Sequence, residues 1–459
     1  MRLKNQEIDM LHGPLAGKII LFTLPIALSS MIQQLFNSAD TAVVGLLGDA
    51  NALAAVGTNT EIVALIVSIS TGLAVGANLL AANRIGRNET DQIPEAARTA
   101  LFLALIIGVG GCLLGLFISE SLLTWIKTPD AIMREAVLYL RVYCLGYPFL
   151  LLYDFASAIL RAHGDSRYPF IALVLSGIVN IGLNLFFVIV VHMGVAGVAA
   201  ATSISTAFSA ALVLRRLIKK TGLSLRNPRM QREYVSEILT TGIPAAVQGA
   251  VFCFANIFVQ ASVNSLGENA IAGNTVTLNF EYFVYYIITG FGQAATTFTG
   301  QNYAAGQHER CRKIFGLSLG LSLLCSAIPV YIIVLFGNFF CGLFTSDPGV
   351  IECAIVRMMC VMVFEPLCSF YEIPAGCLRG RGHSLYPAVA TVVGTCVLRL
   401  VWIFTVFKAN PTLPTLYHVF PLSYFLTIFL VNMGFVFTRT KRQSVVEKVN
   451  SQKSIVNSQ

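Results

Sequence analysis

The chain has 459 residues, of which 56% are hydrophobic and only 12% are charged, and its mean hydropathy is +0.73. Soluble domains are about a quarter charged, so this composition excludes a soluble fold. The net charge of +8 does not indicate nucleic-acid binding, because Lys and Arg crowd alternate loops between apolar segments. That distribution follows the positive-inside rule of membrane proteins.

The first half of the chain contains six apolar segments, each long enough to cross a hydrocarbon core of about 30 Å as a helix. We predict spans at 18–47, 53–83, 97–118, 132–160, 168–192 and 194–217. These spans form an N-terminal six-helix lobe, 1–217, which a basic cytoplasmic linker, 218–236, connects to the second half.

The second half repeats this scheme as a C-terminal six-helix lobe, 237–437. Its predicted spans are 237–265, 269–302, 312–337, 350–379, 385–407 and 414–437. A polar cytoplasmic tail, 438–459, follows, and its composition favours disorder. The basic loops place both termini in the cytoplasm. An even number of spans, such as twelve, is needed for both termini to lie on the same side.

The two halves share motifs at a nearly constant offset. Leu160-Arg161-x-x-Gly164 matches Leu378-Arg379-x-x-Gly382, 218 residues later, and Pro25 matches Pro244, 219 residues later. Since each half has an even number of spans, both enter the membrane in the same orientation, related by a pseudo-two-fold axis along the membrane normal. The predicted fold is an all-α membrane protein with two six-helix bundles and a central cleft, an arrangement that favours transport by alternating access.

Polar residues of the first predicted span lie on one helical face. Gln33, Asn37 and Asp40 follow one another at steps of four and three. Ionisable groups inside spans are costly and normally face protein or water, so this face is predicted to line the cleft. Asp40 could then release a proton on one side of the membrane and take one up on the other. The alternative is that Asp40 only holds helices together.

Two further spans of the first half carry candidate groups. Asn180 and Asn184 stand four residues apart in 168–192, and Asp154 lies in 132–160. Such amides either line a cavity or join helices by hydrogen bonds. We assign Asp40, Asn37, Asn180, Asn184 and Asp154 to a predicted coupling-ion site.

The second half contains a candidate surface for organic cations in 269–302. Glu281, Tyr285 and Gln293 recur there at multiples of four residues. A carboxylate beside an aromatic ring can hold an organic cation, although tyrosines also anchor helices at membrane interfaces.

Glu365 and Glu372 lie on one face of 350–379, and Arg399 lies in 385–407. They are predicted either to bind substrate or to form a buried structural ion pair. Five deep acids stand against one deep arginine, which predicts an acidic interior that favours cations. The predicted substrate site comprises Gln33, Glu281, Tyr285, Gln293, Glu365, Glu372 and Arg399.

Several motifs together resemble the MATE (multidrug and toxic compound extrusion) transporters over nearly the whole chain. They are Asn37-x-x-Asp40-Thr41, Leu160-Arg161-Ala162-x-Gly164-Asp165, Asn180-x-x-Leu183-Asn184 and Gly300-Gln301-Asn302-Tyr303. The resemblance implies a two-lobed bundle with a V-shaped cleft, driven by a cation gradient and extruding organic cations.

Asp40 matches the first-span acid that the family uses for coupling, and Asn180 matches the Asn near it. Asn184 stands where many relatives carry Asp, and Asp154 where many carry Asn. The seventh-span acid of some branches has no match here, which leaves Glu281 and Glu372 as its counterparts.

The expected function is secondary active antiport, by rocking alternating access, of small and mainly cationic organic compounds against H⁺ or Na⁺. We expect no enzyme activity and no cofactor other than the coupling ion; Na⁺, if it is that ion, would bind near Asp40. The chain is expected to be a monomer in the plasma membrane, in contact with lipid and without nucleic acid.

Three alternative functions remain open. A flippase for a lipid-linked saccharide or lipid of the same superfamily would need cationic groups for a diphosphate. A membrane enzyme would need a nucleophile or a metal site, and a channel of similar fold would need an uninterrupted pore.

Overall fold

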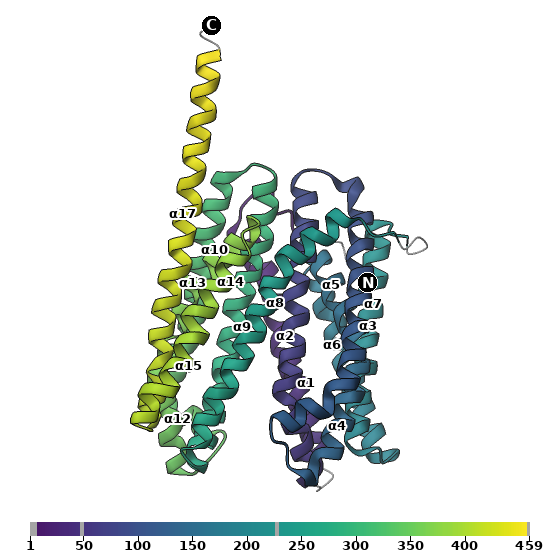
Figure 1. The fold of residues 1–459 in the computed structure, drawn as a ribbon, viewed down its shortest axis with the longest axis vertical. Helices are drawn as coiled ribbons and strands as arrows, with labels where there is room; N and C mark the ends of the chain where they lie inside the picture. The colour runs from purple at the N-terminus through teal and green to yellow at the C-terminus, as the bar shows by residue number, and fades with distance from the viewer. Residues whose placement is uncertain (1–6, 46–49, 225–228, 457–459) are drawn as a thin grey trace.

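The computed structural model describes residues 7–45, 50–224 and 229–456; the side chains of 37–39, 42, 50 and 438–456 lie outside the description. Within that part of the chain the secondary structure is entirely helical. The helices form two bundles that lie side by side, one from each half of the chain (Figure 1).

In the described residues, the first bundle contains seven α-helices. They are α1 (Ala16–Gly45), α2 (Ala50–Gly86), α3 (Ile93–Trp125), α4 (Asp130–Leu145), α5 (Tyr147–Ala162), α6 (Arg167–Leu185) and α7 (Gly194–Thr221), with short η1 (Thr90–Gln92) and η2 (Phe186–Val190). Helices α4 and α5 meet at an angle of 43°.

The second bundle has more interruptions. Its α-helices are α8 (Arg232–Asn264), α9 (Glu268–Ala304), α10 (His308–Leu335), α11 (Gly337–Gly342), α12 (Pro348–Cys360), α13 (Ser369–Gly380), α14 (Leu385–Thr391), α15 (Leu398–Trp402), α16 (Leu413–Tyr417) and α17 (Val419–Val456). The segments η3 (Met362–Cys368), η4 (Val392–Val397) and η5 (Ile403–Phe407) join them.

Helices of the described residues cover each of the twelve predicted segments, and the all-α fold class is confirmed. Nine helices of the described chain are long and apolar enough to cross a membrane, or ten when α4 and α5 count as one bent span. Helix α9 and the segment from α12 to α13, which cover the other two predicted spans, carry buried ionisable side chains and are not among these nine or ten. Helix α17 is described as far as Val456, and the disorder expected for the tail, 438–459, stays a prediction.

Proline breaks the fourth span of each half at the same point. Pro148 stands at the start of α5, and Pro366 lies in η3, 218 residues later. Proline has no N–H to donate and its ring clashes with the preceding turn, so the helical hydrogen-bond ladder is interrupted there. The internal repeat is therefore visible in the backbone.

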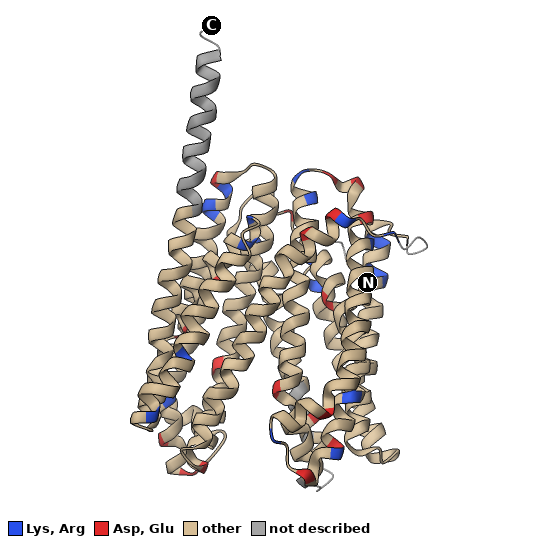
Figure 2. Cartoon of the chain, in the orientation of Figure 1, with Lys and Arg blue, Asp and Glu red and all other residues tan. Residues whose placement is uncertain are grey.

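Each bundle has its own apolar core. Leu80, Leu151 and Phe155 are fully buried in the first, and Ile288 and Tyr417 in the second. Large apolar side chains also point outward, with Phe117 81% exposed and Leu335 77% exposed. Lipid would cover these outward side chains. Charged residues gather at the two ends of the bundles, and few lie between them (Figure 2).

The bundles meet where α2 packs against α8. A Cβ atom on Gly76 would overlap the carbonyl of Ile238, and one on Gly72 would lie 2.8 Å from the carbonyl carbon of Ala245. Small residues let the two backbones approach closely, which is how helices associate inside membranes.

Candidate functional site

Asp40 is the centre of a buried polar cluster in the first lobe. Its side chain belongs to α1 and the residue is only 4% exposed. Asn184 of α6 donates a hydrogen bond from Nδ2 to Asp40 Oδ1 at 2.5 Å, and Thr202 of α7 donates from Oγ1 to Oδ2 at 2.9 Å. Three helices therefore converge on one carboxyl group.

Asn180 completes this cluster. Its Oδ1 accepts a hydrogen bond from Asn184 Nδ2 at 3.1 Å, and its Nδ2 donates to Thr202 Oγ1 at 3.2 Å. The Oδ1 atom of Asn184 is buried and has no hydrogen-bond partner among the described residues. Carboxylate, amide and hydroxyl oxygens are the donors that hard cations prefer, so the cluster has the chemistry to hold H⁺ or Na⁺.

Thr202 is a member of the cluster that the sequence analysis missed. It lies in an alanine-rich span that contains a short polar run, Thr202, Ser203, Ser205 and Thr206. That run was the available signal. The side chain of Asn37 lies outside the described residues, so its predicted role is not addressed by the structure.

Asp154 is held elsewhere in the same lobe. It is 8% exposed on α5, and Ser70 of α2 donates a hydrogen bond to its Oδ2 at 2.7 Å. Among the described residues, no hydrogen bond connects Asp154 with Asp40 or its partners, although the two acids are predicted to share one site.

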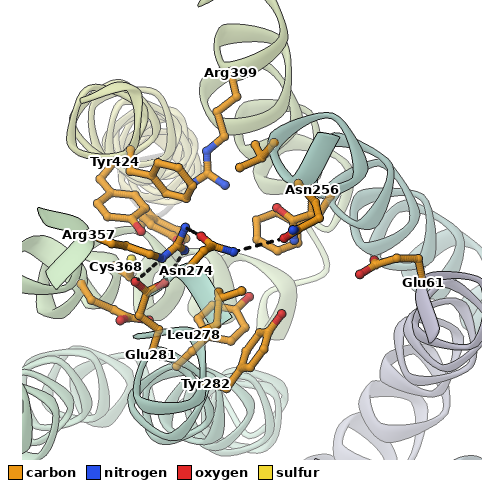
Figure 3. A pocket seen from close by; sticks show the side chains of 17 residues that line it. Glu61, Asn256, Asn274, Leu278, Glu281, Tyr282, Arg357, Cys368, Arg399 and Tyr424 are labelled. Carbon is orange, nitrogen blue, oxygen red and sulfur yellow. Dashed lines mark hydrogen bonds and ion pairs between the residues drawn. The ribbon is translucent and has the colours of Figure 1, made fainter. Parts of the chain in front are cut away.

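The second lobe contains a cavity with about 820 Å³ of space free of protein atoms, part of it open to solvent. Figure 3 shows its lining, which comes mainly from α8, α9, η3, α15 and α17. Four predicted substrate residues line it: Glu281, Tyr285, Glu365 and Arg399.

The other three predicted substrate residues are not in this lining. Gln33 and Gln293 are half-buried on α1 and α9. Glu372 lies beside Arg379, whose Nη1 is 3.4 Å from Glu372 Oε1. The structure therefore divides the predicted substrate site into a cavity and residues outside it.

Glu281 forms a buried, two-pronged ion pair with Arg357 of α12. Arg357 Nε and Nη2 lie 2.8 and 2.7 Å from the two carboxylate oxygens. Arg357 Nη1 also donates to Asn274 Oδ1 at 2.6 Å, and the Tyr417 hydroxyl donates to the same oxygen at 3.1 Å. Such bidentate contacts fix geometry as well as charge.

The expectation of a single deep arginine was wrong, because Arg357 is 3% exposed within the predicted span 350–379. Burying an arginine inside a span costs about as much free energy as burying an acid. The position of Arg357 within the predicted span could therefore have identified it as a buried charged group. The interior is consequently less acidic than predicted.

Arg399 does not form the ion pair that the sequence left open as an alternative. In the described residues no carboxylate lies within 4 Å of its nitrogens. Its guanidinium instead stacks 4.1 Å from the ring centre of Phe420, and its Nε donates to Ser423 Oγ at 3.3 Å. Glu365 is 5% exposed, and its Oε2 has no hydrogen-bond partner in the described structure.

Repeated halves, membrane-spanning helices and a buried ionisable cluster in each lobe define a two-lobed membrane transporter. The MatE family model matches this chain twice, over residues 25–186 and 244–405, once in each half. The chain therefore belongs to the MATE family, whose members are transporters and not enzymes.

Known proteins resemble the chain over most of its length. It is 27% identical to the probable multidrug resistance protein YpnP of Bacillus subtilis, over 85% of this chain and 88% of that protein. It is 28% identical to the probable multidrug resistance protein NorM of Thermotoga maritima, over 85% of each chain. A crystal structure of MATE in complex with MaL6 shares the fold, with a TM-score of 0.87 and 24% identity over 97% of this chain and all of the other.

Proposed function

We propose that this protein is an antiporter that exports small, mainly cationic organic compounds in exchange for H⁺ or Na⁺. The buried Asp40 cluster carries the proposal, because it presents a carboxyl group together with amide and hydroxyl oxygens inside a transporter lobe. The relatives named as multidrug resistance proteins support export of small organic compounds and favour it over the flippase.

We propose that coupling arises because the Asp40 cluster has two states, one with a bound proton or Na⁺ and one without. An ion that binds at Asp40 must disturb the hydrogen bonds from Asn184 and Thr202, which belong to different helices. Ion binding and release can therefore alter how α1 packs against α6 and α7. A ligand can shift a conformational equilibrium only through such a difference between states.

Rocking of one bundle against the other would expose the cavity of the second lobe alternately to each side. We place the protein in the plasma membrane as a monomer, with the basic loops and both termini in the cytoplasm. The distribution of Lys and Arg supports that orientation.

The test is exchange of ethidium by protein in oriented liposomes under an imposed H⁺ or Na⁺ gradient. We expect Asp40→Asn to abolish exchange, because an amide cannot ionise, while the protein remains folded. Export that depends on only one of the two gradients identifies the ion.

Two variants serve as controls. Glu120→Gln removes an acid on the protein surface, 68% exposed as a side chain, and should leave exchange unchanged. Asp154→Asn tests whether Asp154 belongs to the coupling site, because among the described residues its hydrogen bond is to Ser70 and not to the Asp40 cluster; exchange close to wild type would place Asp154 outside the site. Full exchange by Asp40→Asn would remove Asp40 from the mechanism, and equal loss in Asp154→Asn would extend the coupling site to Asp154.

A further inference from the structure

The N-terminal segment 7–13 crosses from one lobe to the other on the face that carries the basic loops. Its first residues contact the first lobe: Glu7 Oε1 lies 2.9 Å from Lys220 Nζ of α7, and Ile8 N donates to Gly164 O at 3.3 Å. Its later residues contact the second lobe and the start of α1. A segment that is attached to both lobes resists any motion that separates them on this face.

The attachment to the second lobe is buried and has several contacts. Met10 is 1% exposed and belongs to an apolar cluster with Phe298 of α9. Arg310 of α10 donates to the backbone carbonyls of Met10, His12 and Gly13 at 3.3, 3.0 and 2.9 Å. Apolar burial and charge-assisted hydrogen bonds therefore hold this end of the segment together.

The attachment to the first lobe is more open. Glu7 is 44% exposed as a side chain, so solvent and salt screen its ion pair with Lys220. Beside these contacts lies a crevice with about 1030 Å³ of space free of protein atoms, part of it open to solvent. Residues 7–11 form one wall of the crevice, and the other walls come mainly from α2, α3, α5 and α7 of the first lobe. The segment is therefore packed against the second lobe and partly separated from the first.

These two attachments should break in a fixed order when the lobes separate on this face. Alternating access requires such a separation once in each transport cycle. Water can replace the exposed ion pair and the backbone hydrogen bond to the first lobe at little cost. Lifting Met10 would instead expose a buried apolar side chain and break the contacts with Arg310. The segment should therefore stay with the second lobe.

We propose that the segment 7–13 is a latch, anchored on the second lobe and released from the first lobe at Lys220 and Gly164, and that its release limits how fast this face opens. The inference rests on the proposed export function, because a protein that exposes its cavity to both sides must open this face. Glu7 and Lys220 are the pair of charges that closes the latch, so reversing one charge should release it and reversing both should close it again.

The experiment measures amide hydrogen exchange of the full-length protein in nanodiscs, without any ion gradient. The amide of Ile8 reports the latch directly, because it donates to Gly164 O. The amides of 163–165, at the end of α5, report the first lobe, and those of 305–306, at the end of α9, report the second. We expect Glu7→Lys to speed exchange about fivefold at Ile8 and 163–165 and to leave 305–306 unchanged, because only the first-lobe attachment is lost.

Three further variants accompany Glu7→Lys. Lys220→Glu should have the same effect, because it also places two like charges together. The double variant Glu7→Lys with Lys220→Glu should return exchange to the wild-type rate, since the attraction is restored with the charges swapped. Glu233→Lys reverses an exposed acid of α8 that has no ion pair within the described part of the chain, and should behave as wild type.

Unchanged exchange at Ile8 and 163–165 in Glu7→Lys would overturn the latch, as would a double variant without recovery. Equal acceleration at 305–306 would overturn the anchor on the second lobe. In liposomes, Glu7→Lys should raise the initial rate of ethidium export about threefold, and an unchanged rate would show that release does not limit opening. Wild-type protein with the expected amide exchange but no export under either gradient would overturn only the antiport.

Discussion

Glu281 and Arg357 place opposite charges together in the interior of the second lobe. The guanidinium lies over the rings of Tyr417 and Phe420 at 5.1 and 5.3 Å, in addition to its ion pair. Both residues line the cavity, and each charge is neutralised by the other. The pair therefore holds α9 and α12 together, with rings of α16 and α17 packed against the guanidinium.

We expect Glu281→Gln to destabilise the protein by about 3–5 kcal/mol, because it strands a buried guanidinium. The thermal unfolding midpoint in detergent measures the effect. The double variant Glu281→Gln with Arg357→Met should recover most of the loss, since neither charge then remains. If the double variant loses as much stability as Glu281→Gln and Arg357→Met lose separately when added together, the two residues do not act as a structural ion pair.

The contact between α2 and α8 depends on glycine. Gly72 and Gly76 of α2 face the backbone of α8, and Gly242 of α8 faces Leu73. The absence of side chains at these three glycines lets the two helices approach closely. A larger residue at any of them would clash with backbone atoms of the other helix, which cannot move aside as a side chain can.

Gly72→Val is therefore expected to cost about 1–3 kcal/mol through overpacking, measured as a lower thermal unfolding midpoint. Gly110→Val in α3 is the matched control, since a Cβ atom there meets nothing within 4 Å. Equal midpoints for the two variants would show that the α2–α8 contact does not require glycine.

At the scale of the whole molecule, polar contacts join the halves on the face that carries the basic loops. Arg84 of α2 lies 3.2 Å from Glu237 of α8, and Asn83 Nδ2 donates to the same carboxylate at 2.9 Å. The N-terminal segment 7–13 lies across both halves: Ile8 N donates to Gly164 O at 3.3 Å, and Asn302 Nδ2 donates to Met10 O at 3.1 Å.

These contacts must break if the face opens during transport, so the segment 7–13 should stabilise the closed face. Removing residues 1–13 is expected to speed amide hydrogen exchange about tenfold at the ends of α5 and α9, because several hydrogen bonds of about 1 kcal/mol each are lost. Exchange in α4, which makes no hydrogen bond with the segment within the described residues, should not change. Unaltered exchange at both helix ends would show that the segment contributes nothing to closure.

The apolar helical segments, the duplication and the presence of buried acids could be predicted from the sequence, because each is a property of local composition and spacing. The length of an apolar run determines whether it can cross a membrane, and the repeat of Leu160-Arg161 at Leu378-Arg379 is visible in the letters alone. The break at the proline of the fourth span was not predicted, because the apolar segment continues on both sides of the proline.

The partners of the buried groups were decided only by the tertiary structure. Thr202 reaches Asp40 from 162 residues away, and Arg357 reaches Glu281 from 76 residues away. Helical periodicity shows which residues share a face of one helix but not how that helix is rotated against its neighbours. Sequence alone therefore identified a family of transporters with buried acids, and the packing of the helices determined that Glu281 is neutralised while Arg399 still faces an open cavity.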